Sequence, residues 1–191
     1  MIECLTPDVG WFERTMPPKV IKYKIHDDEL IQSLITMMDE TGDEMGHGTN
    51  LFCSMTEYRS QLKSKYKIVF ENVISLVNGI LKENKLSCET ADIWCAKYTS
   101  GDFTRPHQHS PSPWSFCFYL NEFKEFPPLE IDGHGKVKPE RGLLVVFPGW
   151  VQHEVKPKEF NGSRYVCAGN VYRTMWKKDG KFPIELRGII K

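Results

Sequence analysis

The spacing of hydrophobic residues changes near the middle of the chain. Between residues 27 and 42 the apolar positions recur at helical spacing, with Asp27 placed to cap a helix and Gly42 just beyond its end. The same spacing recurs from about Tyr58 to Lys82 and predicts a second, longer amphipathic helix. An apolar stripe of this kind usually packs into the core, so both helices are expected to cover a neighbouring layer.

Beyond Ser87 the spacing of the apolar residues is no longer that of a helix. Four runs rich in β-branched and aromatic residues are bounded by Gly, Pro, Asn and Ser: ADIWCAKY, PWSFCFYL, GLLVVF and RYVCAGNVY. Short strands separated by turns are typical of a β-sandwich or barrel rather than a doubly wound parallel sheet. We therefore predict an α+β fold in which N-terminal helices pack on one sheet of a β-sandwich, all within one domain.

Composition narrows the class of protein. The 191 residues include 25 basic and 25 acidic side chains, so no net field attracts phosphate and a nucleic-acid partner is not expected. The six Cys form no C-x-x-C pair and are interpreted as buried, reduced thiols. The N-terminus lacks a signal-peptide core, and no apolar run approaches the roughly 18 residues of a membrane span. We expect a cytoplasmic protein (host cytoplasm for a viral chain) without a membrane partner.

Histidine is the residue type that best indicates chemistry here, because the common nucleotide and nucleophile motifs are missing. His107 and His109 lie two apart, so in an extended chain they point to the same side. His153 follows the GLLVVF run and the Pro148-Gly149 turn. These three side chains can form a facial triad with open positions, as in non-haem Fe(II) oxygenases. An H-x-H alone is weak, since about one sequence in five of this composition has one by chance.

Arg164 is a candidate for binding a carboxylate. It opens the run RYVCAGN, in which Val166, Ala168 and Asn170 share its face and include small residues that leave room for a ligand. A guanidinium binds a carboxylate through two parallel hydrogen bonds. The alternative is a solvated charge at a sheet edge.

The distance between Arg164 and His153 constrains this interpretation. A tight hairpin at Asn161-Gly162 would hold the two residues roughly 20 Å apart along a strand, too far for one small dicarboxylate. The strand at His153 is therefore predicted to end early, with a longer loop opening at Lys156-Pro157.

Three motifs in the β half carry a family resemblance. They are G-D-x-x-R-P-H-x-H with a following W-S, then F-P-x-W-x-x-H, then Arg followed by a strand that ends in Asn. In this order and spacing, over about residues 91–172, they resemble the 2-oxoglutarate- and Fe(II)-dependent oxygenases, in particular the small prolyl-hydroxylase-like proteins of bacteriophages. The resemblance implies a double-stranded β-helix (jelly-roll) core over residues 87–175. Residues 1–86 would give mainly helical support and 176–191 a C-terminal tail, within a single oxygenase domain spanning 1–191.

The resemblance also implies roles for single residues. His107, His109 and His153 correspond to the Fe(II) ligands, and no further catalytic residue is implied. Arg164 corresponds to the clamp on the distal carboxylate of 2-oxoglutarate. Three further residues are candidates for the cosubstrate pocket: Tyr119, Tyr98 and Asn170. For both tyrosines an aromatic core position is an equally good interpretation.

The implied activity is hydroxylation of a protein or small-molecule substrate, with prolyl or other amino-acid residues as the family-level expectation and 2-oxoglutarate and O2 as cosubstrates. One departure matters, because the second ligand is usually Asp and here it is His109. A three-His cupin-type dioxygenase independent of 2-oxoglutarate is therefore an alternative. A metal-free jelly-roll binding or virion module is another. Whether the chain forms a homo-oligomer is left open.

Overall fold

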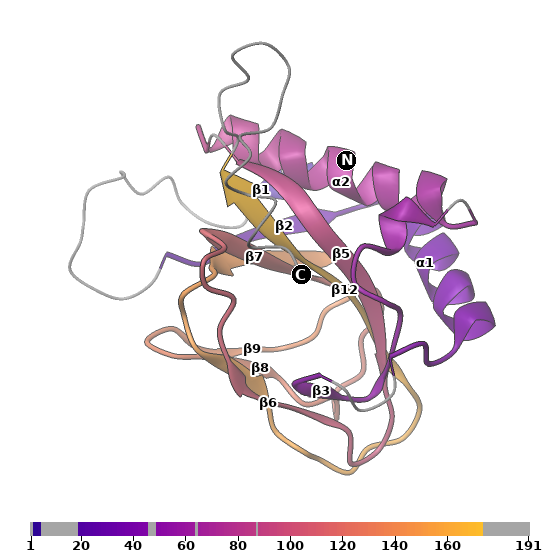
Figure 1. The fold of residues 1–191 in the computed structure, drawn as a ribbon. Helices are drawn as coiled ribbons and strands as arrows, with labels where there is room; N and C mark the ends of the chain where they lie inside the picture. The colour runs from indigo at the N-terminus through magenta and orange to yellow at the C-terminus, as the bar shows by residue number, and fades with distance from the viewer. Residues whose placement is uncertain (1, 5–18, 46–48, 64, 87, 174–191) are drawn as a thin grey trace.

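The structure is a computed structural model that describes residues 2–4, 19–45, 49–63, 65–86 and 88–173. The predicted tail over residues 176–191 lies outside these ranges. The described elements comprise two α-helices, one short 3-10 helix and twelve strands (Figure 1).

The first helix forms where the sequence predicts it. Helix α1 spans Asp28–Thr41, and the side chain of Asp27 accepts a hydrogen bond of 2.9 Å from the backbone N–H of Leu30. Gly42 ends the helix at φ +71°, a left-handed conformation that glycine adopts without steric cost. Both predicted caps are confirmed.

The second helix begins later than predicted. Helix α2 spans Lys67–Glu83, and residues Ser60–Leu62 before it form the separate 3-10 helix η1. The prediction of helix from Tyr58 was wrong because Arg59 adopts a left-handed conformation at φ 62°, which interrupts a helix, and Leu62 is 75% exposed. The apolar stripe that reaches the core therefore starts at Tyr66.

Two antiparallel sheets form the body of the molecule. The larger sheet has the order β1 (Ile2–Cys4), β2 (Ile21–Ile25), β10 (Leu143–Pro148), β7 (Trp114–Tyr119), β12 (Arg164–Arg173), β5 (Cys88–Tyr98) and β4 (Ser54–Met55). The smaller sheet has the order β3 (Leu51–Phe52), β6 (Phe103–His107), β11 (His153–Val155), β8 (Leu129–Ile131) and β9 (Gly135–Val137). Four of these strands contain the runs predicted from the sequence.

The larger sheet has two buried faces. Along β5, Ile93 and Cys95 join the core that the sheet forms with α1 and α2. Trp94, Ala96 and Tyr98 alternate with them and join the core between the two sheets. Figure 1 shows the helices on one side of the larger sheet and the smaller sheet on the other. This confirms the predicted α+β architecture with N-terminal helices packed on one sheet.

Some strands lie in segments whose residue pattern does not predict a strand. Strand β2 joins the larger sheet beside β10, although its segment IKYKI precedes the first predicted helix. Its side chains alternate between buried and half-buried, as expected for a strand near a sheet edge. Strands β3, β8 and β9 have two or three residues each, too short for a periodicity to be recognised.

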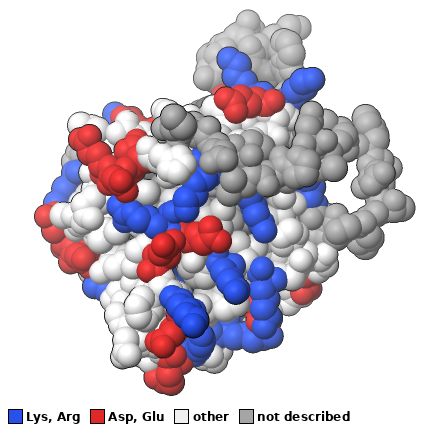
Figure 2. All heavy atoms as spheres, turned by 180° about the vertical axis from the view of Figure 1, so that it is seen from behind, with Lys and Arg blue, Asp and Glu red and all other residues white. Residues whose placement is uncertain are grey.

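The surface and the cysteines agree with the composition. Basic and acidic side chains are interspersed over the face drawn in Figure 2. Among the cysteines whose side chains are described, Cys53, Cys95, Cys117 and Cys167 are free and buried, and Cys88 is half-buried. Among the described helices none has the length and apolar character needed to cross a membrane.

Two glycines test how tightly the larger sheet is packed. A Cβ at Gly169 in β12 would lie 2.4 Å from the carbonyl oxygen of Asp92 and 2.5 Å from the ring of Phe116, whereas a Cβ at Gly79 in α2 meets nothing within 4 Å. We expect Gly169→Ala to lower the free energy of unfolding by about 2 kcal/mol. Gly79→Ala should raise it by about 0.5–1 kcal/mol. Urea unfolding followed by circular dichroism measures both, and equal effects would contradict the packing described.

Candidate metal centre and anion pocket

Three histidines meet at one end of the paired strands β6 and β11 in the smaller sheet. His107 is the last residue of β6 and lies opposite His153, the first residue of β11. His109 follows two residues after β6, and its Nε2 lies 3.2 Å from Nε2 of His153. One ring nitrogen from each of the three side chains lies within 4.8 Å of the others, an arrangement that could hold a metal ion. The three residues selected from the sequence are thus brought together.

The backbone around the Pro148-Gly149 turn brings His109 to His153. The N–H of His109 donates to the carbonyl oxygen of Gly149 at 2.6 Å, and the N–H of Gly149 donates to the carbonyl oxygen of Pro113 at 3.0 Å. A Cβ on residue 149 would lie 2.1 Å from the carbonyl oxygen of Ser112, so only glycine permits this close approach. The loop after β6 is therefore fixed against the turn before β11.

A bulge in β6 sets the direction of His107. His153 lies opposite His107, but Val155 lies opposite Thr104, so β6 contains one residue more than β11 over this stretch. Such an extra residue bends a strand and redirects a side chain. Pro106 lies within the bulged stretch, where a residue without an N–H is tolerated.

Backbone carbonyl groups fix the ring orientation of two of the histidines. Nδ1 of His107 lies 2.8 Å from the carbonyl oxygen of Arg105, and Nδ1 of His153 lies 3.0 Å from that of Val151. Each Nδ1 therefore carries the proton and donates to a carbonyl, which leaves Nε2 with a free lone pair. Metal-ligating histidines in proteins are commonly held in this way.

Burial keeps the three imidazoles neutral. Loss of solvent, with a smaller contribution from the neighbouring rings, lowers the pKa of His109 to about 3 and that of His153 to about 4. Burial also lowers the pKa of His107. A metal ligand must be deprotonated, and these side chains meet that requirement at neutral pH.

Arg164 is buried, with a solvent exposure of 1%. Its guanidinium packs over the ring of Tyr98 at 4.6 Å and that of Tyr119 at 5.4 Å. Within the described part of the chain, its Nε and Nη1 have no hydrogen-bond partner, and neither does the hydroxyl oxygen of Tyr119. A guanidinium stays charged in proteins, so these unpaired donors favour an anion.

The three other residues selected from the sequence have different positions relative to the pocket. Tyr98 lines the pocket, and its hydroxyl lies 2.7 Å from Oγ1 of Thr104. Tyr119 faces Arg164 from the interior, as the alternation with Cys117 predicts. Asn170 is not among the residues that line the pocket, and its Oδ1 accepts a hydrogen bond of 3.1 Å from Oγ of Ser115.

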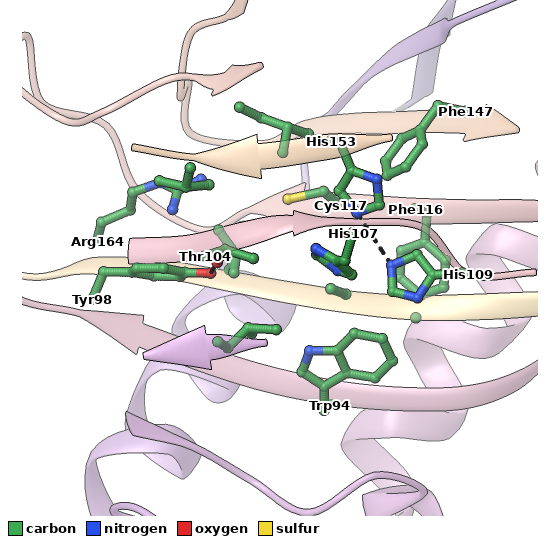
Figure 3. A pocket seen from close by; sticks show the side chains of 16 residues that line it. Trp94, Tyr98, Thr104, His107, His109, Phe116, Cys117, Phe147, His153 and Arg164 are labelled. Carbon is green, nitrogen blue, oxygen red and sulfur yellow. Dashed lines mark hydrogen bonds between the residues drawn. The ribbon is translucent and has the colours of Figure 1, made fainter. Parts of the chain in front are cut away.

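One pocket between the two sheets connects the histidine cluster with Arg164 (Figure 3). Apolar side chains form much of its wall, including Leu51, Phe116, Leu129, Phe147, Val155 and Val166. Trp94 and Thr104 also line it, although neither was selected from the sequence. The two-residue alternation of β5 places Trp94 on the same face as Tyr98, so Trp94 could have been selected from the sequence as a pocket residue.

The loop before Arg164 has the length predicted from the reach argument. Strand β11 ends at Val155, and β12 begins at Arg164 in the opposite sheet, where Arg164 pairs with Tyr98. Residues 156–163 connect them, and Phe160 from this loop is buried against Phe126 with ring centroids 5.2 Å apart. The predicted longer loop is confirmed.

No protein-family model matches this chain, and no curated protein matches it in sequence. Solved structures do resemble it. A prolyl-4-hydroxylase from Pseudomonas putida is 20% identical, with a TM-score of 0.60 over 78% of this chain and 89% of its own. The viral collagen prolyl hydroxylase of Paramecium bursaria Chlorella virus-1, solved as a 2-oxoglutarate complex, is 14% identical, with a TM-score of 0.62 over 81% of this chain and 96% of its own.

HygX from Streptomyces hygroscopicus, solved with nickel and 2-oxoglutarate bound, is 12% identical. Its TM-score is 0.63 over 88% of this chain and 89% of its own. At such identities the likeness shows the fold, and this chain has the double-stranded β-helix, or jelly-roll, fold that the sequence predicts. The narrower resemblance to phage-type proteins stays a prediction.

The low pKa values of the histidines predict how the stability of the metal-free protein depends on pH. Below pH 6.5 the unfolded chain takes up protons that the half-buried imidazole of His109 refuses until about pH 3 and the buried imidazole of His153 until about pH 4. The free energy of unfolding should therefore fall with decreasing pH over this window, by up to about 1.4 kcal/mol per pH unit for each imidazole.

Urea unfolding in a chelator at several pH values measures this dependence. The variant His109→Asn removes one of the two contributions and should show a shallower fall. Identical slopes for the variant and the wild type would show that His109 titrates normally in the folded protein.

Proposed function

We propose that this protein is a non-haem Fe(II), 2-oxoglutarate-dependent oxygenase that hydroxylates its substrate. The observation that carries the proposal is the pairing of two features in one buried pocket. Three neutral imidazoles converge at one end, and the guanidinium of Arg164 lies at the other with unpaired donors. Few ligands other than a small dicarboxylate that also chelates a metal would satisfy both ends.

The histidine cluster fits a divalent metal. A metal–nitrogen bond of about 2.1 Å places two ligand nitrogens about 3.0 Å apart at a right angle and about 3.4 Å apart at the tetrahedral angle. The Nε2 atoms of His109 and His153 lie 3.2 Å apart, between these values. Three imidazoles on one side leave further coordination positions toward the pocket, as a facial arrangement requires.

The Arg164 end fits a carboxylate. Nε and Nη1 belong to the two edges of the planar guanidinium, Nε–Nη2 and Nη1–Nη2, each of which can bind two carboxylate oxygens in parallel, and each edge has an unpaired donor. The hydroxyl of Tyr119 offers a third donor beside them. Arg164 is only 1% exposed, so little water competes at this end, which strengthens each of these interactions.

In the proposed mechanism the protein positions the reactants and keeps the site dry. His107, His109 and His153 hold the metal, and Arg164 with Tyr119 anchors the distal carboxylate so that the keto-acid end points toward the histidines. Bound Fe(II) with 2-oxoglutarate and O2 supplies the oxidising power: one oxygen atom enters a C–H bond of the substrate, the other enters succinate, and carbon dioxide is released. The carbonyl groups of Arg105 and Val151 keep the rings oriented.

Prolyl residues in a protein are the first substrate class to test, because two of the similar solved structures are prolyl hydroxylases. The two alternatives predict different outcomes. Substrate oxidation that continues without 2-oxoglutarate would indicate a three-His dioxygenase of the cupin type. Absence of metal binding altogether would indicate a metal-free jelly-roll module.

Removal of one histidine should abolish turnover. We expect Fe(II)-loaded wild-type protein to convert 2-oxoglutarate slowly to succinate even without the primary substrate, and His153→Ala to lose this activity because two imidazoles hold the metal poorly. Succinate formation in air measures it, with metal content determined in parallel. The matched control is His134→Ala, which alters an exposed histidine outside the cluster. Equal rates in wild type and His153→Ala would refute the assignment.

Replacement of Arg164 should weaken binding of 2-oxoglutarate selectively. Arg164→Met removes two hydrogen bonds to a carboxylate, each about 1.5–3 kcal/mol. We therefore expect the KM for 2-oxoglutarate to rise by about 100-fold or more. The metal affinity should stay unchanged. Arg141→Met, which removes a surface guanidinium paired with Asp28, serves as the control. A normal KM in Arg164→Met would contradict the anchoring role.

A further inference from the structure

Trp94 carries a buried donor that no part of the proposed mechanism uses. Its side chain is 3% exposed, and its indole Nε1 has no hydrogen-bond partner among the described residues. Buried tryptophans normally pair this N–H. The unpaired indole N–H therefore indicates a hydrogen-bond acceptor on a ligand, and such a ligand would lie in the pocket that Trp94 lines.

The position of Trp94 on β5 assigns it to the histidine end of the pocket. Its ring centroid lies 6.2 Å from that of His109. Opposite it on β12 is Ala168, a small residue that leaves space beside the indole. Figure 3 shows Trp94 beneath His107 and His109, with its indole nitrogen turned toward the pocket interior.

Strand register separates this donor from Arg164. Arg164 lies opposite Tyr98, and Trp94 precedes Tyr98 by four residues, roughly 13 Å along the strand. The two donors thus flank the pocket at opposite ends. A dicarboxylate anchored by Arg164 at one end would place its second carboxylate among the histidines, where the indole N–H is available.

Tyr58 holds the indole ring in place. The two rings meet edge to face, with centroids 5.0 Å apart and planes at 83°. Such a contact fixes the plane of the indole, and with it the direction of the N–H. An indole N–H is a donor only, so it cannot compete with imidazole for the metal and can pair only with an acceptor such as a carboxylate oxygen.

We infer that the indole N–H of Trp94 donates a hydrogen bond to the carboxylate at the keto-acid end of 2-oxoglutarate, and so helps to orient the cosubstrate against the three histidines. The inference rests on the proposed function. It adds a binding residue that works at the opposite end of the ligand from Arg164, without adding charge to the site.

Binding measurements on variants loaded with Mn(II) test the inference. We expect Trp94→Phe to raise the Kd of 2-oxoglutarate by about tenfold, the effect of one hydrogen bond to a charged group. Oxalate, which has an adjacent carboxylate pair but no distal arm, should lose the same factor. Arg164→Met should weaken 2-oxoglutarate but leave oxalate unchanged. The matched control is Trp114→Phe, since Trp114 packs against the helix-side core and should affect neither ligand.

A measurement on the wild-type chain keeps the test valid if Trp94→Phe fails to fold. In the 15N-labelled, Zn(II)-loaded protein, the indole N–H resonance of Trp94 should move downfield on addition of 2-oxoglutarate or oxalate, while that of Trp114 should not. An unmoved Trp94 resonance in the presence of bound 2-oxoglutarate would overturn the inference.

The outcomes separate the inference from the proposed function. Normal binding of both ligands by a folded Trp94→Phe variant overturns the role of Trp94 and leaves the proposed function standing. No binding of 2-oxoglutarate by the Mn(II)-loaded wild type overturns both.

Discussion

The guanidinium of Arg164 lies in the core between two tyrosine rings, with Nε and Nη1 unpaired. A buried charge of this kind is costly unless an opposite charge accompanies it, and the described residues give Arg164 no acidic partner. The surrounding structure keeps the charge in place, because Arg164 begins β12 opposite Tyr98 and its guanidinium packs over the rings of Tyr98 and Tyr119. The electrostatics of the pocket therefore favour an anion of small size.

The histidine end adds to this preference for an anion. His109 stands where the resembling oxygenases usually have an aspartate, so a divalent ion held here would meet three neutral ligands and keep its full positive charge. Together with Arg164, such a site favours a dianion more strongly than a site with a carboxylate ligand would. The same reasoning gives weight to neutral donors such as the indole of Trp94, because they bind an anion without adding repulsion toward the metal.

Much of the architecture could be predicted from the sequence, because long periodic segments determine it. The caps of α1, the four long strands and the end of the strand at His153 follow from local patterns and a reach argument. The start of α2 could not be predicted, because an apolar stripe does not reveal the left-handed conformation of Arg59. Convergence of the histidines depends on a bulge in β6 and on the close approach at Gly149, and both arise from pairing between distant segments. That the indole nitrogen of Trp94 has no hydrogen-bond partner likewise cannot be predicted without the folded structure.

The most direct test of the account is a crystal structure of the protein grown without oxygen in the presence of Mn(II) and 2-oxoglutarate. The account predicts one metal ion bound by His107, His109 and His153, with one carboxylate of 2-oxoglutarate at the metal and the other paired with Arg164. A metal bound elsewhere, or a 2-oxoglutarate whose distal carboxylate does not contact Arg164, would contradict it.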